Sequence, residues 1–81
     1  MTLYTLMGAD STEWFLTKRE ALARARAVSR ELEAEVTVER ATLVPMTRAN
    51  VCGILNTSGG RCVEESAVVA TVRAGRVVAE K

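Results

Sequence analysis

The sequence predicts an α+β domain, in which a small and mostly antiparallel β-sheet carries one long helix packed on one face. One segment, Lys18–Ala34, has apolar residues at helical spacing among strong helix formers. Short runs of β-forming residues lie before and after this segment, and turn residues separate neighbouring runs. With 81 residues, the chain has room for one domain, which we place at residues 1–81.

The N-terminal residues predict a β-hairpin that leads into the long helix. β-forming residues fill Thr2–Met7 and Thr12–Thr17, and a turn at Gly8–Ser11 joins the two runs. Thr17 is expected to cap the helix, and Glu20, three residues later, completes a capping box. The expected apolar face of the helix consists of Ala21, Leu22, Ala25, Val28 and Leu32.

A third strand and a short helix are predicted after the long helix. The segment Glu35–Val44 has strand character, with a bulge or bend expected at Arg40-Ala41, where the alternation of apolar residues slips. Thr47 is then expected to cap a short helix over Arg48–Leu55.

The C-terminal residues predict a second hairpin. Strands at Ala67–Val72 and Arg76–Ala79 are joined by a glycine-bearing turn at Arg73–Gly75. The element order is therefore β-β-α-β-α-β-β. A right-handed crossover through the long helix sets the third strand beside the first, so the sheet begins with the second, first and third strands. The sequence leaves open where the last two strands lie.

The residues that usually carry chemistry are sparse. The chain contains no histidine, the commonest general base near neutral pH and the commonest metal ligand. Cys52 and Cys62 have neither the spacing of a redox pair nor enough companions for a zinc site, and Cys52 is expected in the core. The glycines of Ser58–Arg61 are typical of a turn and lack the full phosphate-loop pattern. We expect no enzyme, no catalytic residue, no metal ligand and no cofactor.

Net charge, apolar runs and cysteine content indicate which partners and which cellular compartment to expect. Eleven basic and ten acidic residues give a net charge of +1, which favours neither a nucleic-acid binder nor a nucleic-acid mimic. No apolar run has the length of a membrane span, and Met1–Met7 lacks the pattern of a secretory leader. Two cysteines without such a leader fit a reducing cytoplasm, so we expect a cytoplasmic protein.

Four residues are candidates for partner binding. At 100° per residue, Arg19, Arg26 and Arg30 form a basic stripe nearly opposite the apolar face of the long helix, whereas Arg24 lies off the stripe and can pair with Glu20. The stripe is either a surface for an acidic protein patch or phosphate, or an ordinary solvated face.

The fourth candidate comes from an aromatic pair. Trp14 and Phe15 are adjacent on a predicted strand, so their side chains point to opposite faces of the sheet. If the helix covers one face only, the aromatic side chain on the open face is a candidate binding residue, and we name Trp14 for this role.

Two segments carry a resemblance to known proteins. The residues from Tyr4-Thr5 through Thr12–Ala21, with the aromatic pair followed by Thr-Lys-Arg-Glu-Ala, resemble the start of small proteins of bacteriophages and mobile elements. The segment Thr47–Asn56 is similar in character. Such proteins include anti-CRISPR proteins, which bind a nuclease complex stoichiometrically. These proteins share no motif, so the resemblance assigns no functional residue.

The resemblance implies a non-enzymatic binding protein that inhibits a CRISPR–Cas complex of a bacterial host by occluding its surface. Its partner would be a host protein or ribonucleoprotein complex. A small nucleic-acid-binding accessory protein that uses the arginine stripe is the alternative, and a small enzyme or ligand-binding domain ranks last. Salt separates the first two, because binding to nucleic acid through several arginines weakens by orders of magnitude as salt rises.

Overall fold

The elements follow one another in the predicted order. The computed structural model describes residues 1–9, 12–57 and 62–81, so the Ser58–Arg61 segment and part of the Gly8–Ser11 turn lie outside the described residues. The elements are β1 (Thr2–Met7), β2 (Trp14–Phe15), α1 (Lys18–Leu32), β3 (Glu35–Leu43), α2 (Arg48–Asn56), β4 (Val63–Arg73) and β5 (Arg76–Glu80).

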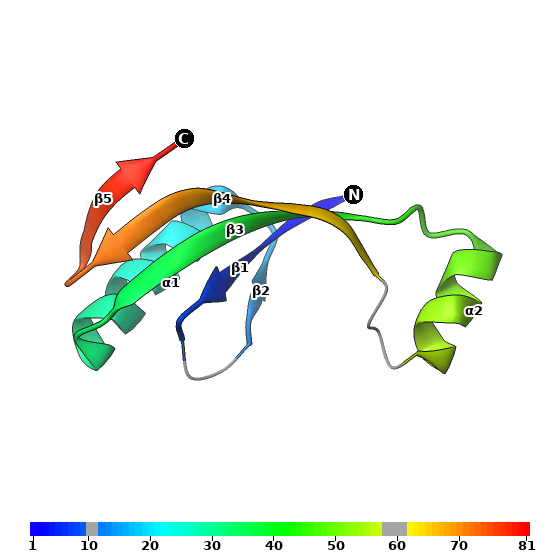
Figure 1. Cartoon of the computed structure of the whole chain (residues 1–81), viewed down its shortest axis with the longest axis horizontal. Coiled ribbons are helices and arrows are strands. Elements are labelled where there is room, and N and C mark those ends of the chain that lie inside the picture. Colours follow the sequence, from blue (N-terminus) through cyan, green and yellow to red (C-terminus); the bar gives the residue numbers. More distant parts are fainter. Residues whose placement is uncertain (10–11, 58–61) are drawn as a thin grey trace.

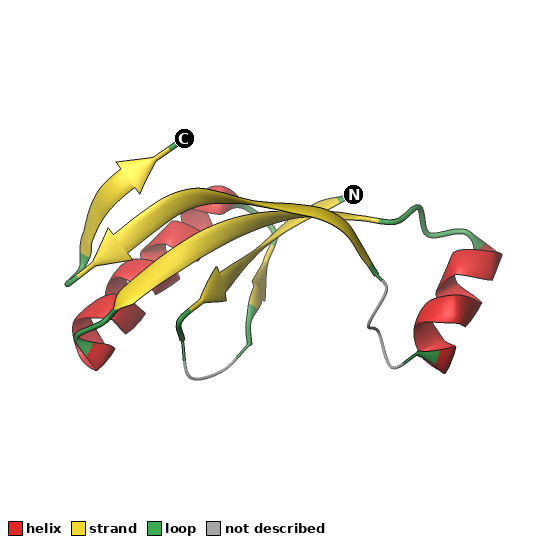
Figure 2. Cartoon of the chain, in the orientation of Figure 1, coloured by secondary structure: helices red, strands yellow, loops and turns green. Residues whose placement is uncertain are grey.

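The strands form one antiparallel sheet in the order β2-β1-β3-β4-β5. The long helix α1 lies against one face of this sheet (Figures 1 and 2). The α+β class, the packing of the helix and the placing of the third strand beside the first are thereby confirmed. The last two strands continue the sheet beyond β3 because a tight turn, with positive φ at both Ala74 and Gly75, folds β5 back beside β4.

The core lies between α1 and the sheet. Three valines, Val36, Val38 and Val72, are fully buried on the sheet side. The helix contributes the predicted face, in which Ala21, Ala25 and Val28 are buried while Leu22 and Leu32 are partly buried against the core. Small side chains on the helix let the backbones approach closely, and the partly buried aromatics Tyr4 and Phe15 pack at the border of the core.

The capping residues are in place at both helices. The Thr17 hydroxyl accepts a hydrogen bond from the Glu20 backbone N–H at 3.2 Å and donates one to the Glu20 carboxylate at 3.0 Å. The Thr47 hydroxyl accepts from the Asn50 N–H at 3.2 Å. The long helix ends at Leu32, two residues before the predicted end, because Glu33 adopts a left-handed conformation with φ of 52°.

Two strand predictions need correction. The second strand covers only Trp14–Phe15 rather than Thr12–Thr17, since only these residues pair with β1 and the chain bends at Leu16 to enter α1. The expected bulge at Arg40-Ala41 is also wrong. β3 pairs with β1 without interruption, and the irregularities lie where β3 pairs with β4, in which Glu64 and Val69 are extra residues.

The short helix α2 stands apart from the sheet, at the far end of the molecule from α1 and β5 (Figure 1). The structure describes all nine of its residues, and none is buried. The prediction that Cys52 lies in the core is therefore wrong, because this helix has no sheet to pack against. Cys52 is exposed, Cys62 is partly buried, and both are free thiols.

Candidate functional site

The helix α1 and the edge strand β5 border a groove of about 620 Å³. Its lining residues are Lys18, Arg19, Leu22, Ala23 and Arg26 from the helix and Val77 and Glu80 from the strand. Leu22, Ala23 and Val77 give the groove an apolar centre. On the helix, Lys18 and Arg19 precede Leu22 and Ala23, and Arg26 follows them, so the groove combines an apolar patch with charged residues on either side of it.

An ion pair closes one end of the groove. Lys18 Nζ lies 2.8 Å from Glu80 Oε2 and also donates to the Lys81 carbonyl oxygen at 3.0 Å. Both side chains of the pair are partly exposed, so its main effect is on local charge rather than on stability. Since Lys18 and Glu80 neutralise each other, Arg19 and Arg26 give the groove a net positive charge.

The turn between β4 and β5 is fastened to α1 at the other end of the groove. The Gly75 N–H donates to Ser29 Oγ at 2.9 Å, and the Ser29 hydroxyl donates to the Arg26 carbonyl at 3.1 Å. Arg26 Nε donates to the Gly75 carbonyl at 3.1 Å. One turn of the helix thus satisfies both backbone groups of Gly75, and the guanidinium of Arg26 is held beside the groove.

The predicted arginine stripe is divided by this arrangement. Arg19 and Arg26 line the groove together, whereas Arg30 lies over the β4–β5 turn, beside a separate cavity of about 510 Å³ that Glu33, Arg73 and Ala74 also line. A Cβ atom at position 75 would lie 2.7 Å from Arg30 Nη2. The stripe is therefore not the free face opposite the core that its spacing predicts, because Arg26 and Arg30 lie against the turn.

Trp14 lies at the other edge of the sheet from the groove, since β2 and β5 are the two ends of the strand order. It pairs with Thr5, while its neighbour Phe15 packs against the core. Alternation along the strand therefore points Trp14 to the face away from α1, where its side chain is 46% exposed. The structure does not bring Trp14 together with the arginines.

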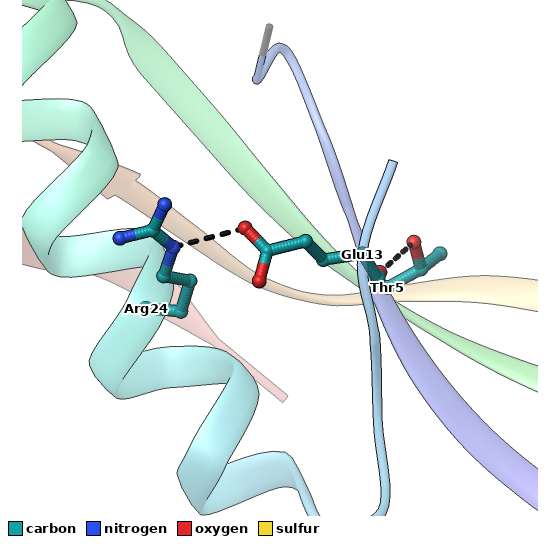
Figure 3. Close-up of polar contacts among 3 residues, drawn as sticks. All are labelled: Thr5, Glu13 and Arg24. Atoms are coloured by element: carbon teal, nitrogen blue, oxygen red, sulfur yellow. Dashed lines mark hydrogen bonds and ion pairs between the residues drawn. The ribbon is translucent and has the colours of Figure 1, made fainter. Parts of the chain in front are cut away.

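The predicted pair of Arg24 and Glu20 does not form. Arg24 Nε instead donates to Glu13 Oε1 at 3.0 Å, and the Glu13 backbone carbonyl accepts from the Thr5 hydroxyl at 2.8 Å (Figure 3). Glu20 is engaged by the capping Thr17. Glu13 thus connects the first hairpin to the helix, and neither Arg24 nor Glu13 is among the residues that line the groove.

Two further cavities differ from the groove in their lining residues, and the first, lined by Arg30, Glu33, Arg73 and Ala74, has a volume of about 510 Å³. A smaller cavity of about 250 Å³, on the part of the sheet toward α2, is polar and contains one arginine and one glutamate, Arg40 and Glu65. Within residues 1–9, 12–57 and 62–81, no cluster of three or more His, Cys, Asp or Glu side chains could hold a metal ion. Over the same residues, neither helix has the length and apolar character of a membrane span.

Sequence reasoning missed several residues that build the groove. Ser29 lies beside the apolar face at helical spacing; it is completely buried, and its hydroxyl accepts the hydrogen bond of the Gly75 N–H. Leu22 borders the same face and so lies near the arginines. No local sequence pattern predicts that Val77 and Glu80 lie beside α1, because this contact depends on where β5 joins the sheet.

Comparisons with known proteins do not narrow the interpretation. The chain matches no protein-family model, and searches of curated proteins and of solved structures gave no match. The groove is therefore interpreted from its own residues.

Proposed function

We propose that this chain is a non-enzymatic binding protein that occludes a surface of a host defence complex, as anti-CRISPR proteins of bacteriophages do. In this proposal it acts in the cytoplasm of a bacterial host and binds a protein or ribonucleoprotein complex. The groove between α1 and β5 carries the proposal, because its apolar centre and cationic rim are the composition of a protein interface.

The position of the arginines supports an acidic protein patch as the partner. Arg26 is held in place by its bond to the Gly75 carbonyl, so it loses little conformational freedom when a partner binds. A guanidinium has five N–H donors, and the bond to Gly75 uses Nε only. Its terminal nitrogens can still bind a carboxylate in the bidentate manner. Arg19, with its side chain exposed at the same groove, adds a second charge.

A nucleic acid fits the groove less well. Three apolar residues, Leu22, Ala23 and Val77, line its centre, and no aromatic side chain is among its lining residues to stack on a base. The nucleic-acid alternative nevertheless makes a distinct prediction. Binding through several phosphate contacts would weaken by orders of magnitude between about 50 and 200 mM salt, whereas a protein interface with an apolar centre weakens much less.

The test is a titration of CRISPR–Cas effector complexes with the purified chain, with cleavage of target DNA as the readout. A binding inhibitor reaches its end point at a fixed molar ratio to the complex, and the end point does not move with incubation time. Inactivation by far less than one chain per complex, growing with time, would indicate an enzyme. No effect on any of the CRISPR–Cas types would contradict the proposal.

A further inference from the structure

The helix α2 carries an apolar surface that its own chain does not cover. Four large apolar residues in α2 and just outside it are exposed: Met46, Val51, Leu55 and Val63. Leu55 is 75% exposed. At helical spacing, Val51, Cys52 and Leu55 lie on one face of α2. None of the nine residues of α2 is buried, although the structure describes them all.

A helix of this length needs packing to be stable. Isolated helices shorter than about 12–15 residues are marginal in water, because the cost of nucleation is spread over few hydrogen bonds. α2 has nine residues and includes Gly53, whose backbone disfavours a helix. Its caps stabilise the ends, but the packing that most protein helices rely on is missing from the single chain.

The exposed area of the whole chain is larger than expected for a compact protein of its mass. A compact protein of 8.8 kDa is expected to expose about 4,800 Å², whereas this chain exposes 5596 Å². The difference of about 800 Å² is summed over the whole chain. The radius of gyration is 13.9 Å, against about 12 Å expected for a compact chain of this length. The chain therefore exposes more surface than a compact chain of its mass, and α2, which has no buried residue, contributes to that excess.

The charges of α2 favour a second copy of the same helix as the partner. The helix has no acidic residue in its first turn and no basic residue in its last turn, and Arg48 stands at its N-terminal end. A cation there is unfavourable for the dipole of its own helix and favourable beside the C-terminal end of another. An antiparallel pair of α2 helices places each Arg48 beside the last turn of its partner, and the two dipoles then oppose each other.

We propose that two copies of this chain form a dimer in which α2 packs antiparallel against α2 of the second copy. The two-fold axis passes near Cys52, which is the middle residue of the helix, and Val51 and Leu55 form the centre of the contact. The interface is isologous, because the same face of each helix meets its counterpart. It lies at the other end of the molecule from the groove, so the proposal is independent of the partner that the groove binds.

The test is the mass of the full chain in solution, measured by sedimentation equilibrium over a range of concentrations in reducing buffer. We expect twice the 8.8 kDa of the chain at high concentration. Leu55→Glu places a charge in the centre of the contact and should raise the dissociation constant at least about tenfold. Leu16→Glu is the matched control, because Leu16 is also 75% exposed but lies before α1, and it should leave the dimer unchanged.

Oxidative cross-linking tests whether the middle of α2 lies at the two-fold axis of the dimer. A Cys62→Ser variant should form a covalent dimer through Cys52, and a Cys52→Ser variant should form none. A monomeric mass at every concentration would overturn the proposal. The partner that covers α2 would then be a different protein. A dimer that Leu55→Glu does not weaken would overturn it as well, because the contact would then lie elsewhere. A dimer that does not cross-link through Cys52 would overturn the placing of the two-fold axis near this residue.

Discussion

The hydroxyl of Ser29 and the backbone N–H of Gly75 form a buried hydrogen bond of 2.9 Å between residues 46 positions apart in the chain. This bond fixes the β4–β5 turn against the C-terminal part of α1. Because β5 forms one wall of the groove and α1 the other, the same bond sets the distance between the two walls. The geometry of the candidate site thus depends on a residue that does not line it.

Removal of the Ser29 hydroxyl should destabilise the fold. In Ser29→Ala the Gly75 N–H stays buried and loses its partner, which should lower the free energy of unfolding by about 1–3 kcal/mol. Urea denaturation measures this difference. Ser66→Ala is the matched control, since Ser66 is exposed on β4 and the same change there should fall within about 0.5 kcal/mol. Equal effects at the two positions would show that the Ser29 bond adds nothing.

A side chain at position 75 should also be destabilising. Gly75 has φ of +80°, a conformation that L-residues rarely adopt, and a Cβ atom there would lie 2.7 Å from Arg30 Nη2. We expect Gly75→Ala to lower the free energy of unfolding by about 1–2 kcal/mol. In an Arg30→Ala background the steric part disappears, so the same change should cost less. A Gly75→Ala protein as stable as the wild type would contradict this account of the turn.

Truncating a core side chain should cost more stability on β3 than at the end of α1. Val38 is fully buried, so Val38→Ala should lower the free energy of unfolding by about 2–3 kcal/mol through lost burial and the cavity left behind. Leu32 is only partly buried, so Leu32→Ala should cost about 1–2 kcal/mol, below the range for a fully buried leucine. A larger loss at Leu32 than at Val38, measured by chemical denaturation, would mean that the helix end is packed differently.

The sequence predicts the elements well because their signals are local. The apolar face of α1 follows from spacing alone, and Thr17 and Thr47 cap their helices with donors only three residues away. The start of the strand order follows from the handedness of the crossover. The turn before β5 is visible in Gly75, although the exact turn, at Ala74-Gly75, is shorter than predicted.

The contacts that the sequence does not predict join residues distant in the chain. Arg24 forms an ion pair with Glu13 rather than with Glu20, because the folded hairpin places Glu13 beside the helix. The sequence predicts Cys52 in the core because valine, isoleucine and leucine in a short helix are typical of a core helix. Cys52 is exposed because α2 lies beyond the ends of β3 and β4, apart from α1. No local sequence pattern predicts that separation.

The central claim, that the groove between α1 and β5 is the binding surface, is tested most directly by a pair of matched substitutions on α1. Ala23 and Ala27 are both exposed on this helix, but only Ala23 is among the groove-lining residues. Ala23→Glu fills the apolar centre and sets a carboxylate near Arg19 and Arg26, whereas Ala27→Glu makes the same chemical change outside the groove. Both variants should keep the wild-type fold by circular dichroism, since exposed positions tolerate substitution within about 0.5 kcal/mol.

The measurement is the concentration of each variant that halves DNA cleavage by the CRISPR–Cas complex that the wild-type chain inhibits. The account predicts that Ala23→Glu raises this concentration at least about tenfold, as loss of a central contact should, and that Ala27→Glu leaves it unchanged. Equal inhibition by the two variants and the wild-type chain would contradict the claim and move the binding surface away from the groove.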